Sequence, residues 1–237
     1  MESSISVIIP ALNEENNIIP TVNSVLSILK DKFNEYEVII FDDASKDNTL
    51  VKANELAGQN NRIKVVHNEN TMGLGYNYSK GVKIAKNEYI IMVPGDNEIE
   101  PNSIKAMLEY IGKVDIITTY SVNSNIRPIS RQITSKIFTG LMNFLFNLNL
   151  KYYNGISIHK RNLLNSIEMT TYGFAYHAEI LVMLLRKGCT FAQVGMYLKK
   201  REYGKSKAFA FKNVISVLKT TLKLFIDVRL KNDPKKI

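Results

Sequence analysis

Cysteine and long apolar stretches are nearly absent from this sequence. Its one cysteine, Cys189, cannot form an internal disulfide, which excludes a disulfide-stapled scaffold and favours a reducing compartment. No stretch approaches the roughly 20 apolar residues that a membrane-spanning helix needs. Residues 137–150 come nearest, but asparagines interrupt them. Because the amino terminus also lacks the charged start and apolar stretch of a signal peptide, a cytoplasmic location is expected.

Repeats, low-complexity tracts and Gly/Ser-rich linkers are missing as well, so nothing marks a second domain. A chain of 237 residues with 45% apolar content can build one large domain with a substantial core. We therefore expect one main domain.

Acidic residues are scarce only towards the carboxyl end. The formal net charge is +9, yet residues 1–198 hold 19 basic and 19 acidic side chains, and residues 199–237 hold 12 basic and 3 acidic ones. The position of a basic excess decides whether it indicates nucleic-acid binding. Here the whole excess lies in a tail without a reading motif, so no nucleic-acid partner is expected.

Elsewhere, acidic residues follow short apolar runs. The runs with the acids that follow them are Val7 to Ile9 with Glu14, Val38 to Ile40 with Asp42 and Asp43, and Ile90 to Val93 with Asp96 and Glu98. Continuous apolar runs are typical of strands covered on both faces, as in a parallel sheet. Since ligands of open α/β sheets bind beyond the carboxyl ends of such strands, we expect these acidic edges to meet at one rim.

Helical patterns separate the strands, which predicts an α/β fold with right-handed crossovers and a mainly parallel sheet. Gly58 is expected to end the helix that starts near residue 50. The expected helices cover residues 18–29, 50–57, 103–110, 131–150, 160–167 and 176–187, and residues 73–85 are expected to form a loop that enters a helix. Further strands are expected at residues 63–66, 115–119, 156–159 and 190–198.

The acidic edges suit two kinds of chemistry. A carboxylate beyond a strand can accept hydrogen bonds from a base or a ribose hydroxyl, and one beside a diphosphate can hold Mg²⁺ or Mn²⁺. A lone aspartate at such a position is more often a turn or capping residue. Several edges at one rim favour the binding interpretation. The prime candidates are Asp42, Asp43, Asp96 and Glu98.

Three motifs carry a resemblance to a known family. Residues 6–15 (SVIIPALNEE), residues 42–47 (DDASKD) and residues 73–75 (GLG) with Gly81 resemble the nucleotide-binding half of inverting family-2 glycosyltransferases of the GT-A type. Within that family, the sequence is most similar to polyprenyl-phosphate sugar synthases of the dolichol-phosphate mannose type. The resemblance extends to about residue 207.

The resemblance implies a domain layout and a nucleotide site. A GT-A domain is expected over residues 1–207, with a Rossmann-like nucleotide-sugar-binding half (1–120) and an acceptor half (121–207), followed by a basic amphipathic helix in residues 208–237. Asp42 is expected beside the nucleotide, and glycines let the backbone turn tightly near it. The implied nucleotide contacts are Pro10, Leu12, Glu14, Asp43, Gly73 and Gly75.

The third acidic edge departs from the family pattern. The family has an aspartate, any residue and a second aspartate here, whereas this sequence has Pro94-Gly95-Asp96. Asp96 matches the second aspartate, which implies that it is a catalytic residue and a metal ligand. Glu98 lies two residues further on, where it can supply another oxygen ligand. With fewer anionic ligands, Mg²⁺ or Mn²⁺ is expected to bind weakly and to depend on the diphosphate of the donor.

The second half supplies the candidates near the acceptor. Glu179 matches the family acid at that place and is the catalytic candidate, although a helical glutamate is often simply solvated. His177 is an alternative base, because imidazole titrates near neutrality, but a lone histidine is more often structural. His67 and His159 show no pairing or spacing that indicates a function.

Several basic residues are expected to hold phosphate groups. The segment from Arg201 to Lys207 (REYGKSK) matches an arginine-to-Gly-x-Ser-Lys segment of the family, which implies that Arg201, a catalytic candidate, grips a diphosphate or an acceptor phosphate together with Ser206 and Lys207. Arg127 and Arg131 fall where the synthases keep further phosphate-binding arginines. The register leaves open that one of these two is only a surface charge.

The tail predicts a basic amphipathic helix. Such a helix can lie in a bilayer interface, where each basic residue near anionic lipid contributes on the order of 1 kcal/mol. The same periodicity suits packing on its own domain or on a partner. The apolar positions are Phe211, Val214, Ile215, Leu218, Leu222 and Phe225, flanked by Lys212, Lys219 and Lys223.

Together these features predict that the protein transfers a sugar, with inversion, from a nucleoside diphosphate sugar to a lipid-linked acceptor at the cytosolic membrane face. Polyprenyl phosphate is the first candidate for this acceptor. A phosphate acceptor is already ionised, whereas a hydroxyl acceptor requires a base such as Glu179. Transfer to a saccharide or lipopolysaccharide hydroxyl is one alternative. A non-catalytic nucleotide-sugar-binding protein is another, because of Pro94. The sequence leaves the oligomeric state open.

Overall fold

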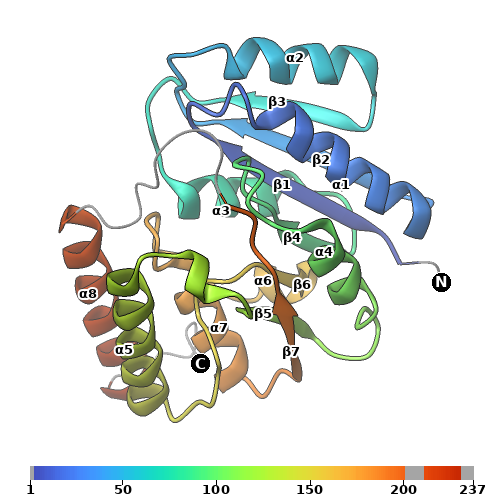
Figure 1. The fold of residues 1–237 in the computed structure, drawn as a ribbon. Helices are drawn as coiled ribbons and strands as arrows, with labels where there is room; N and C mark the ends of the chain where they lie inside the picture. The colour runs from blue at the N-terminus through green and yellow to red at the C-terminus, as the bar shows by residue number, and fades with distance from the viewer. Residues whose placement is uncertain (1–2, 201–210, 231–237) are drawn as a thin grey trace.

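A seven-stranded, mostly parallel sheet forms the centre of the molecule (Figure 1). The computed structural model describes residues 3–200 and 211–230. The strand order is β3-β2-β1-β4-β6-β5-β7, and β6 runs antiparallel to both of its neighbours. The strands are β1 (Ile5–Ala11), β2 (Tyr36–Asp42), β3 (Ile63–His67), β4 (Tyr89–Met92), β5 (Ile116–Ser121), β6 (Ser157–Lys160) and β7 (Phe191–Met196).

Helices cover both faces of the sheet. They are α1 (Ile18–Lys32), α2 (Thr49–Gln59), α3 (Leu74–Ile84), α4 (Pro101–Leu108), α5 (Ile129–Phe146), α6 (Arg161–Asn165), α7 (Tyr176–Arg186) and α8 (Phe211–Phe225), with short turns η1 (Ser124–Ile126) and η2 (Ile226–Leu230). Helices α1, α2 and α4 share one core with Val7 and Ile9, and the other helices share the second with Ile8 and Phe41. Successive strand residues point to opposite faces, so each apolar run serves both cores.

The predicted α/β class, with its mainly parallel sheet and C-terminal helix, is confirmed. The prediction that Gly58 ends α2 is wrong, because the helix continues to Gln59 and ends at Asn60. The φ angle of Gly58 is not positive, so this glycine does not adopt the left-handed conformation that terminates many helices.

Helix α8 packs against α5 of its own domain (Figure 1). Leu224 and Val228 are buried in the second core. The rings of Phe225 and Phe146 lie 6.4 Å apart, and this packing was one of the two alternatives left open by the sequence. No helix within residues 3–200 and 211–230 is long and apolar enough to cross a membrane.

Candidate active site

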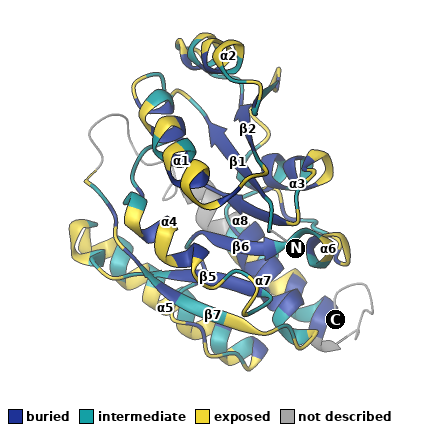
Figure 2. Ribbon diagram, turned by 90° about the vertical axis from the view of Figure 1, so that its right-hand side faces the viewer, coloured by how far each residue is buried: buried dark blue, intermediate teal, exposed yellow. Residues whose placement is uncertain are grey.

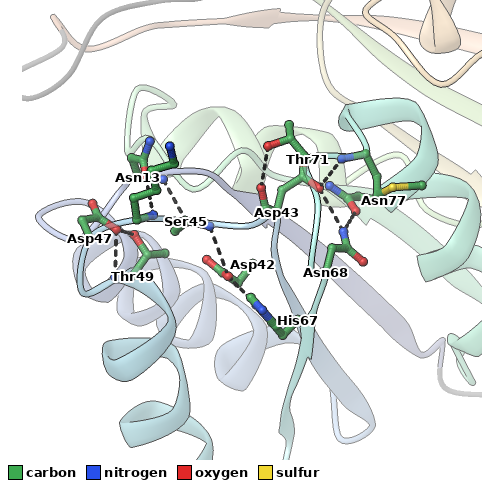
Figure 3. A network of polar contacts seen from close by, with 12 residues as sticks. Asn13, Asp42, Asp43, Ser45, Asp47, Thr49, His67, Asn68, Thr71 and Asn77 are labelled. Atoms are coloured by element: carbon green, nitrogen blue, oxygen red, sulfur yellow. Dashed lines mark hydrogen bonds and ion pairs between the residues drawn. The ribbon is translucent and has the colours of Figure 1, made fainter.

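The loops after β1 and β2 are fastened to each other (Figure 3). Asn13 has a left-handed φ of 57°, which asparagine tolerates better than most residues. Its N–H donates to Ser45 Oγ at 2.9 Å, and its side-chain oxygen accepts from the Lys46 N–H at 2.8 Å. The next N–H, of Glu14, donates to Thr49 Oγ1 at 2.8 Å. Two of the predicted acidic edges therefore form one continuous rim.

Asp47 anchors the start of α2 within this rim. Its carboxylate accepts from the Thr49 N–H at 3.0 Å and from the Glu15 N–H at 3.2 Å. Burial alone would raise the pKa of Asp47, but the hydrogen bonds from Thr49 and Glu15 outweigh burial and lower it. Asn48, at the cap position itself, makes no side-chain capping bond. The carboxylate of Asp47 therefore caps the helix in its ionised form.

Asp42 at the end of β2 is fully buried. Its Oδ2 lies 2.7 Å from Nδ1 of His67, the residue directly beside it in the β2–β3 register, so the imidazole N–H donates to the carboxylate. Nothing in the sequence indicated this partner of His67. Within the part of the chain that the structure describes, Oδ1 of Asp42 has no hydrogen-bond partner. One carboxylate oxygen of Asp42 is thus buried and unsatisfied among the described residues.

Asp43 uses both carboxylate oxygens to hold the turn before α3. Oδ1 accepts from Asn68 Nδ2 and from the Met72 N–H, both at 2.9 Å. Oδ2 accepts from the Gly73 N–H at 3.0 Å. A carboxylate can accept about four hydrogen bonds, so a ligand contact at Asp43 remains chemically possible and stays a prediction.

Gly73 and Gly75 let α3 approach the second half of the chain. Gly73 has a φ of +94°, and a Cβ there would lie 2.8 Å from the carbonyl oxygen of Tyr172. At Gly75 a Cβ would collide with the Thr171 carbonyl oxygen and lie 2.7 Å from Cβ of Tyr176. The close contact between the two halves of the chain therefore requires glycine at both positions. This holds independently of any contact that the two glycines make with a nucleotide.

The loop after β4 carries the third acidic edge. Asn97 has a left-handed φ of 55°, and the Glu98 N–H donates to Asp96 Oδ1 at 3.2 Å, so both acids belong to one tight turn. The Glu98 carbonyl accepts from the Lys199 N–H at 2.7 Å. Nη2 of Arg127 lies 4.0 Å from Oε2 of Glu98, with both side chains mostly buried. This edge is therefore tied to the second half of the chain.

The same turn has the chemistry of a small site for a divalent cation. Carboxylate oxygens such as those of Asp96 and Glu98 are the ligands that Mg²⁺ and Mn²⁺ prefer, so the donor set fits. Over residues 3–200 and 211–230, no group of three or more His, Cys, Asp or Glu residues is arranged to hold a metal ion. A cation here would need further oxygens from a diphosphate and water, and Arg127 would compete for Glu98.

Glu179 lies in the first turn of α7 with 2% of its surface exposed. Its carboxylate accepts from Thr170 Oγ1 at 2.7 Å, from the Thr170 N–H at 3.2 Å and from the Thr171 N–H at 2.9 Å. The alternative that Glu179 is simply solvated is wrong, because this turn of α7 faces the 170–171 segment. Its catalytic role stays a prediction. Its contacts show that it fastens that segment.

His177 is buried beside Glu179 on α7. Its Nδ1–H donates to the Tyr153 carbonyl at 2.7 Å, and the Ser157 hydroxyl donates to Nε2 at 2.8 Å. Burial lowers the pKa of His177 to about 4, against the opposing effect of the hydrogen bond to Tyr153. The imidazole is neutral with both nitrogens engaged, which agrees with a structural role. His159 is similar, since burial and then His177 hold its pKa well below the usual value.

The remaining predicted residues lie in three places. The Pro10 carbonyl accepts from the Gly95 N–H at 3.0 Å, which joins the first edge to the third. Leu12 follows β1 and is half-buried, and Arg131 lies in the first turn of α5, one turn beyond Arg127. Outside the described residues lie Arg201, Ser206 and Lys207.

Residues 6–170 match the model of Glycosyl transferase family 2. The chain belongs to this family. It is 31% identical over 115 residues to Glycosyltransferase GlyG of Streptococcus pneumoniae serotype 4, a match covering 48% of this chain and 37% of that protein. It is 32% identical over 125 residues to the hyaluronan synthase of Pasteurella multocida, covering 52% of this chain and 12% of that protein. The match thus spans well under two thirds of these relatives.

Solved structures of glucosyl-3-phosphoglycerate synthase from Mycobacterium tuberculosis share the fold. The complex of that protein with Mn²⁺, UDP and phosphoglyceric acid has a TM-score of 0.70 at 17% identity, covering 96% of this chain and 78% of that one. Its complex with phosphoglyceric acid has a TM-score of 0.71 at 19% identity, covering 93% and 79%. The family-2 chain therefore has the GT-A fold that its motifs implied. The narrower similarity to polyprenyl-phosphate sugar synthases stays a prediction.

Proposed function

We propose that this chain transfers a sugar, with inversion, from a nucleoside diphosphate sugar to a lipid-linked phosphate, with polyprenyl phosphate as the first candidate. The observation that carries the donor part is the rim at which the loops after β1, β2 and β4 are joined, in a chain of glycosyltransferase family 2. A structural neighbour was solved with UDP and Mn²⁺ or Mg²⁺, which supports the same kind of donor here.

Within this proposal the rim has a binding part and a reacting part. The buried Oδ1 of Asp42 can accept from a nucleotide N–H or O–H, which would remove the cost of an unsatisfied carboxylate oxygen. At the third edge, Asp96 and Glu98 would hold Mg²⁺ or Mn²⁺, which when bound supplies positive charge to the leaving diphosphate. Arg127 lies beside this turn and adds a fixed positive charge.

The proposed reaction exchanges one bond at the anomeric carbon. An acceptor oxygen forms a bond to this carbon from the side opposite the diphosphate, and the bond from the carbon to the diphosphate oxygen breaks. The nucleoside diphosphate leaves with that electron pair. The chain contributes by holding donor and acceptor in line and by excluding water from the reacting carbon.

The contacts of Glu179 favour a phosphate acceptor over a hydroxyl. Its carboxylate is buried and occupied by donors from Thr170 and Thr171, so it is poorly placed to take a proton from a hydroxyl. An ionised phosphate needs no such base. The second candidate, transfer to a saccharide hydroxyl, draws support from the relatives named hyaluronan synthase and chondroitin synthase.

A two-step experiment tests this proposal. A thermal-shift screen of nucleoside diphosphates and their sugars, with and without Mn²⁺, first identifies the donor by its stabilisation of the folded chain. Release of nucleoside diphosphate is then measured with polyprenyl phosphate, with oligosaccharides and with neither. Faster release with polyprenyl phosphate is expected. Release with saccharides only would replace the acceptor, and donor binding without release on either would replace catalysis by a binding function.

A further inference from the structure

The outer face of helix α5 carries exposed apolar side chains along its whole length. Large apolar residues recur there every three or four positions, which places them on one side of the helix. Their exposed fractions are Ile129 73%, Ile133 53%, Ile137 66%, Leu141 37% and Phe144 83%. The opposite side of the helix is buried, through Met142 and Phe146. Figure 2 shows α5 at the edge of the molecule with exposed residues along it.

Helix α8 adds to this exposed apolar area. Leu218 and Leu222 are 54% and 62% exposed, although the sequence placed them on one apolar face with Phe225. The helix lies next to α5, and its Thr221 Oγ1 donates to Met142 Sδ at 3.8 Å. The predicted apolar face is therefore divided, with one part on the domain and the other in solvent. We call the exposed apolar residues of α5 together with Leu218 and Leu222 the α5–α8 surface.

The charged residues of α5 and α8 indicate which kind of partner the α5–α8 surface can bind. Neither α5 nor α8 contains an acidic residue, and their charged side chains are all basic: Arg131, Lys136, Lys212, Lys219 and Lys223. Lys136, Lys219 and Lys223 are exposed. Apolar residues with basic neighbours complement an anionic lipid surface, whereas a second copy of this chain would set like charges against each other.

We propose that the α5–α8 surface docks the protein on an anionic lipid bilayer, with α5 lying in the plane of the interface. The sequence indicated only the tail, whereas the structure also exposes apolar side chains along the whole of α5. Arg127, which faces Glu98, lies two residues before α5, so docking would bring the lipid surface next to the third acidic edge. This inference deepens the proposed function and rests on it for the lipid acceptor.

A single-tryptophan probe tests the docking directly, because the chain contains no tryptophan. Phe144→Trp places the probe on the α5–α8 surface, and Val51→Trp places a matched probe on α2, where Val51 is 54% exposed. Vesicles of phosphatidylglycerol and phosphatidylcholine in equal parts should shift the emission of the Phe144→Trp protein to the blue and leave that of the control unchanged. No shift at position 144, or the same shift at both positions, would overturn the proposal.

Cosedimentation with the same vesicles, without donor or acceptor, gives a second measurement. Ile137→Ser combined with Phe144→Ser should lower the partition coefficient about tenfold or more, while Val51→Ser leaves it unchanged. Equal binding of all proteins would overturn the proposal. So would a concentration-dependent dimer that the double variant dissolves, since a second copy would then cover this face. A protein that docks but releases no nucleoside diphosphate would refute the proposed function alone.

Discussion

The acidic edges of this molecule are held in two different ways. The loops after β1 and β2 hold each other, and their carboxylates accept hydrogen bonds from neighbouring backbone N–H groups, as at Asp43 and Asp47. The loop after β4 is joined to the end of β1 through Gly95 and Pro10, but its Glu98 is also tied to the second half of the chain, through Lys199 and Arg127. Each region has an asparagine with positive φ at its turn, Asn13 and Asn97.

Under the proposed function, this difference separates scaffold from chemistry. Carboxylates that fix backbone turns would give the donor side a preformed shape before a ligand arrives, which lowers the cost of binding. An acidic turn attached to the second half can link the position of the acceptor to the leaving group. Substitutions in the first region should therefore change stability and affinity, and substitutions in the second should change the rate.

Asp96→Asn is expected to give the largest effect. Loss of the carboxylate that would hold the cation at the leaving diphosphate should lower turnover by about a hundredfold to a thousandfold, with little change in melting temperature, since removing the stabilisation of developing charge has that size of effect. Turnover is measured as nucleoside diphosphate release. Asp31→Asn, at an exposed position on α1, is the charge-matched control. Full activity of Asp96→Asn would remove the third edge from the chemistry.

Acidification should distinguish the loops after β1 and β2 from the second half of the chain, where His177 lies on α7. Burial lowers the pKa of His177 from its usual value of 6.5 to about 4, so the unfolded chain binds the proton first as the pH falls. The stabilisation from neutral His177 is complete above pH 6.5 and is lost towards pH 4, on the order of 3 kcal/mol in all. The pKa of Asp47 lies below its usual value of 3.8, so its contribution is lost only at lower pH.

The measurement is the free energy of unfolding in urea between pH 7 and pH 4, for the natural sequence and for His177→Gln. The variant should be less stable at neutral pH and should show a flatter pH dependence in this window. An unchanged slope would mean that folding does not shift the pKa of His177. Hydrogen exchange should show residues 153–157 opening before the loops after β1 and β2.

Asp43→Asn tests the donor-side scaffold at its most connected carboxylate. An amide replaces one acceptor oxygen by a donor, so either Met72 or Gly73 would lose the acceptor for its N–H. The expected cost is about 1–3 kcal/mol of unfolding free energy, together with weaker donor binding. Urea unfolding and nucleotide titration measure the two effects. A stable variant with unchanged affinity would show that this turn does not depend on the ionised carboxylate.

Local patterns made the sheet and the acidic rim predictable. Val38 to Ile40 and Ile90 to Val93 are apolar without interruption, which identifies strands covered on both faces, and chain order alone placed their acidic ends at one edge. The partners of these acids were not predictable. His67 meets Asp42 only because of the β2–β3 register, and Glu179 meets Thr170 only through the packing of α7.

The exposed side of α5 escaped prediction for a related reason. Helical periodicity shows that apolar residues share a face, but it does not show whether the protein itself covers that face. Ile133 and Phe144 lie in the helix that the sequence predicted over residues 131–150, and only the structure shows that they face solvent. The same limit applied to Leu218 and Leu222 in α8.

The smallest and most direct comparison uses the positive-φ asparagines of these two regions, Asn13 and Asn97. Asn13→Ala introduces backbone strain and removes the acceptor for the Lys46 N–H, so it should cost about 1–2 kcal/mol of unfolding free energy. Asn13→Gly keeps the conformation and should cost less. Asn97→Ala should cost about 1 kcal/mol but lower turnover several-fold, because the turn that carries Asp96 and Glu98 shifts. Equal effects of Asn13→Ala and Asn97→Ala on stability and turnover would show that the two regions do not divide scaffold from chemistry.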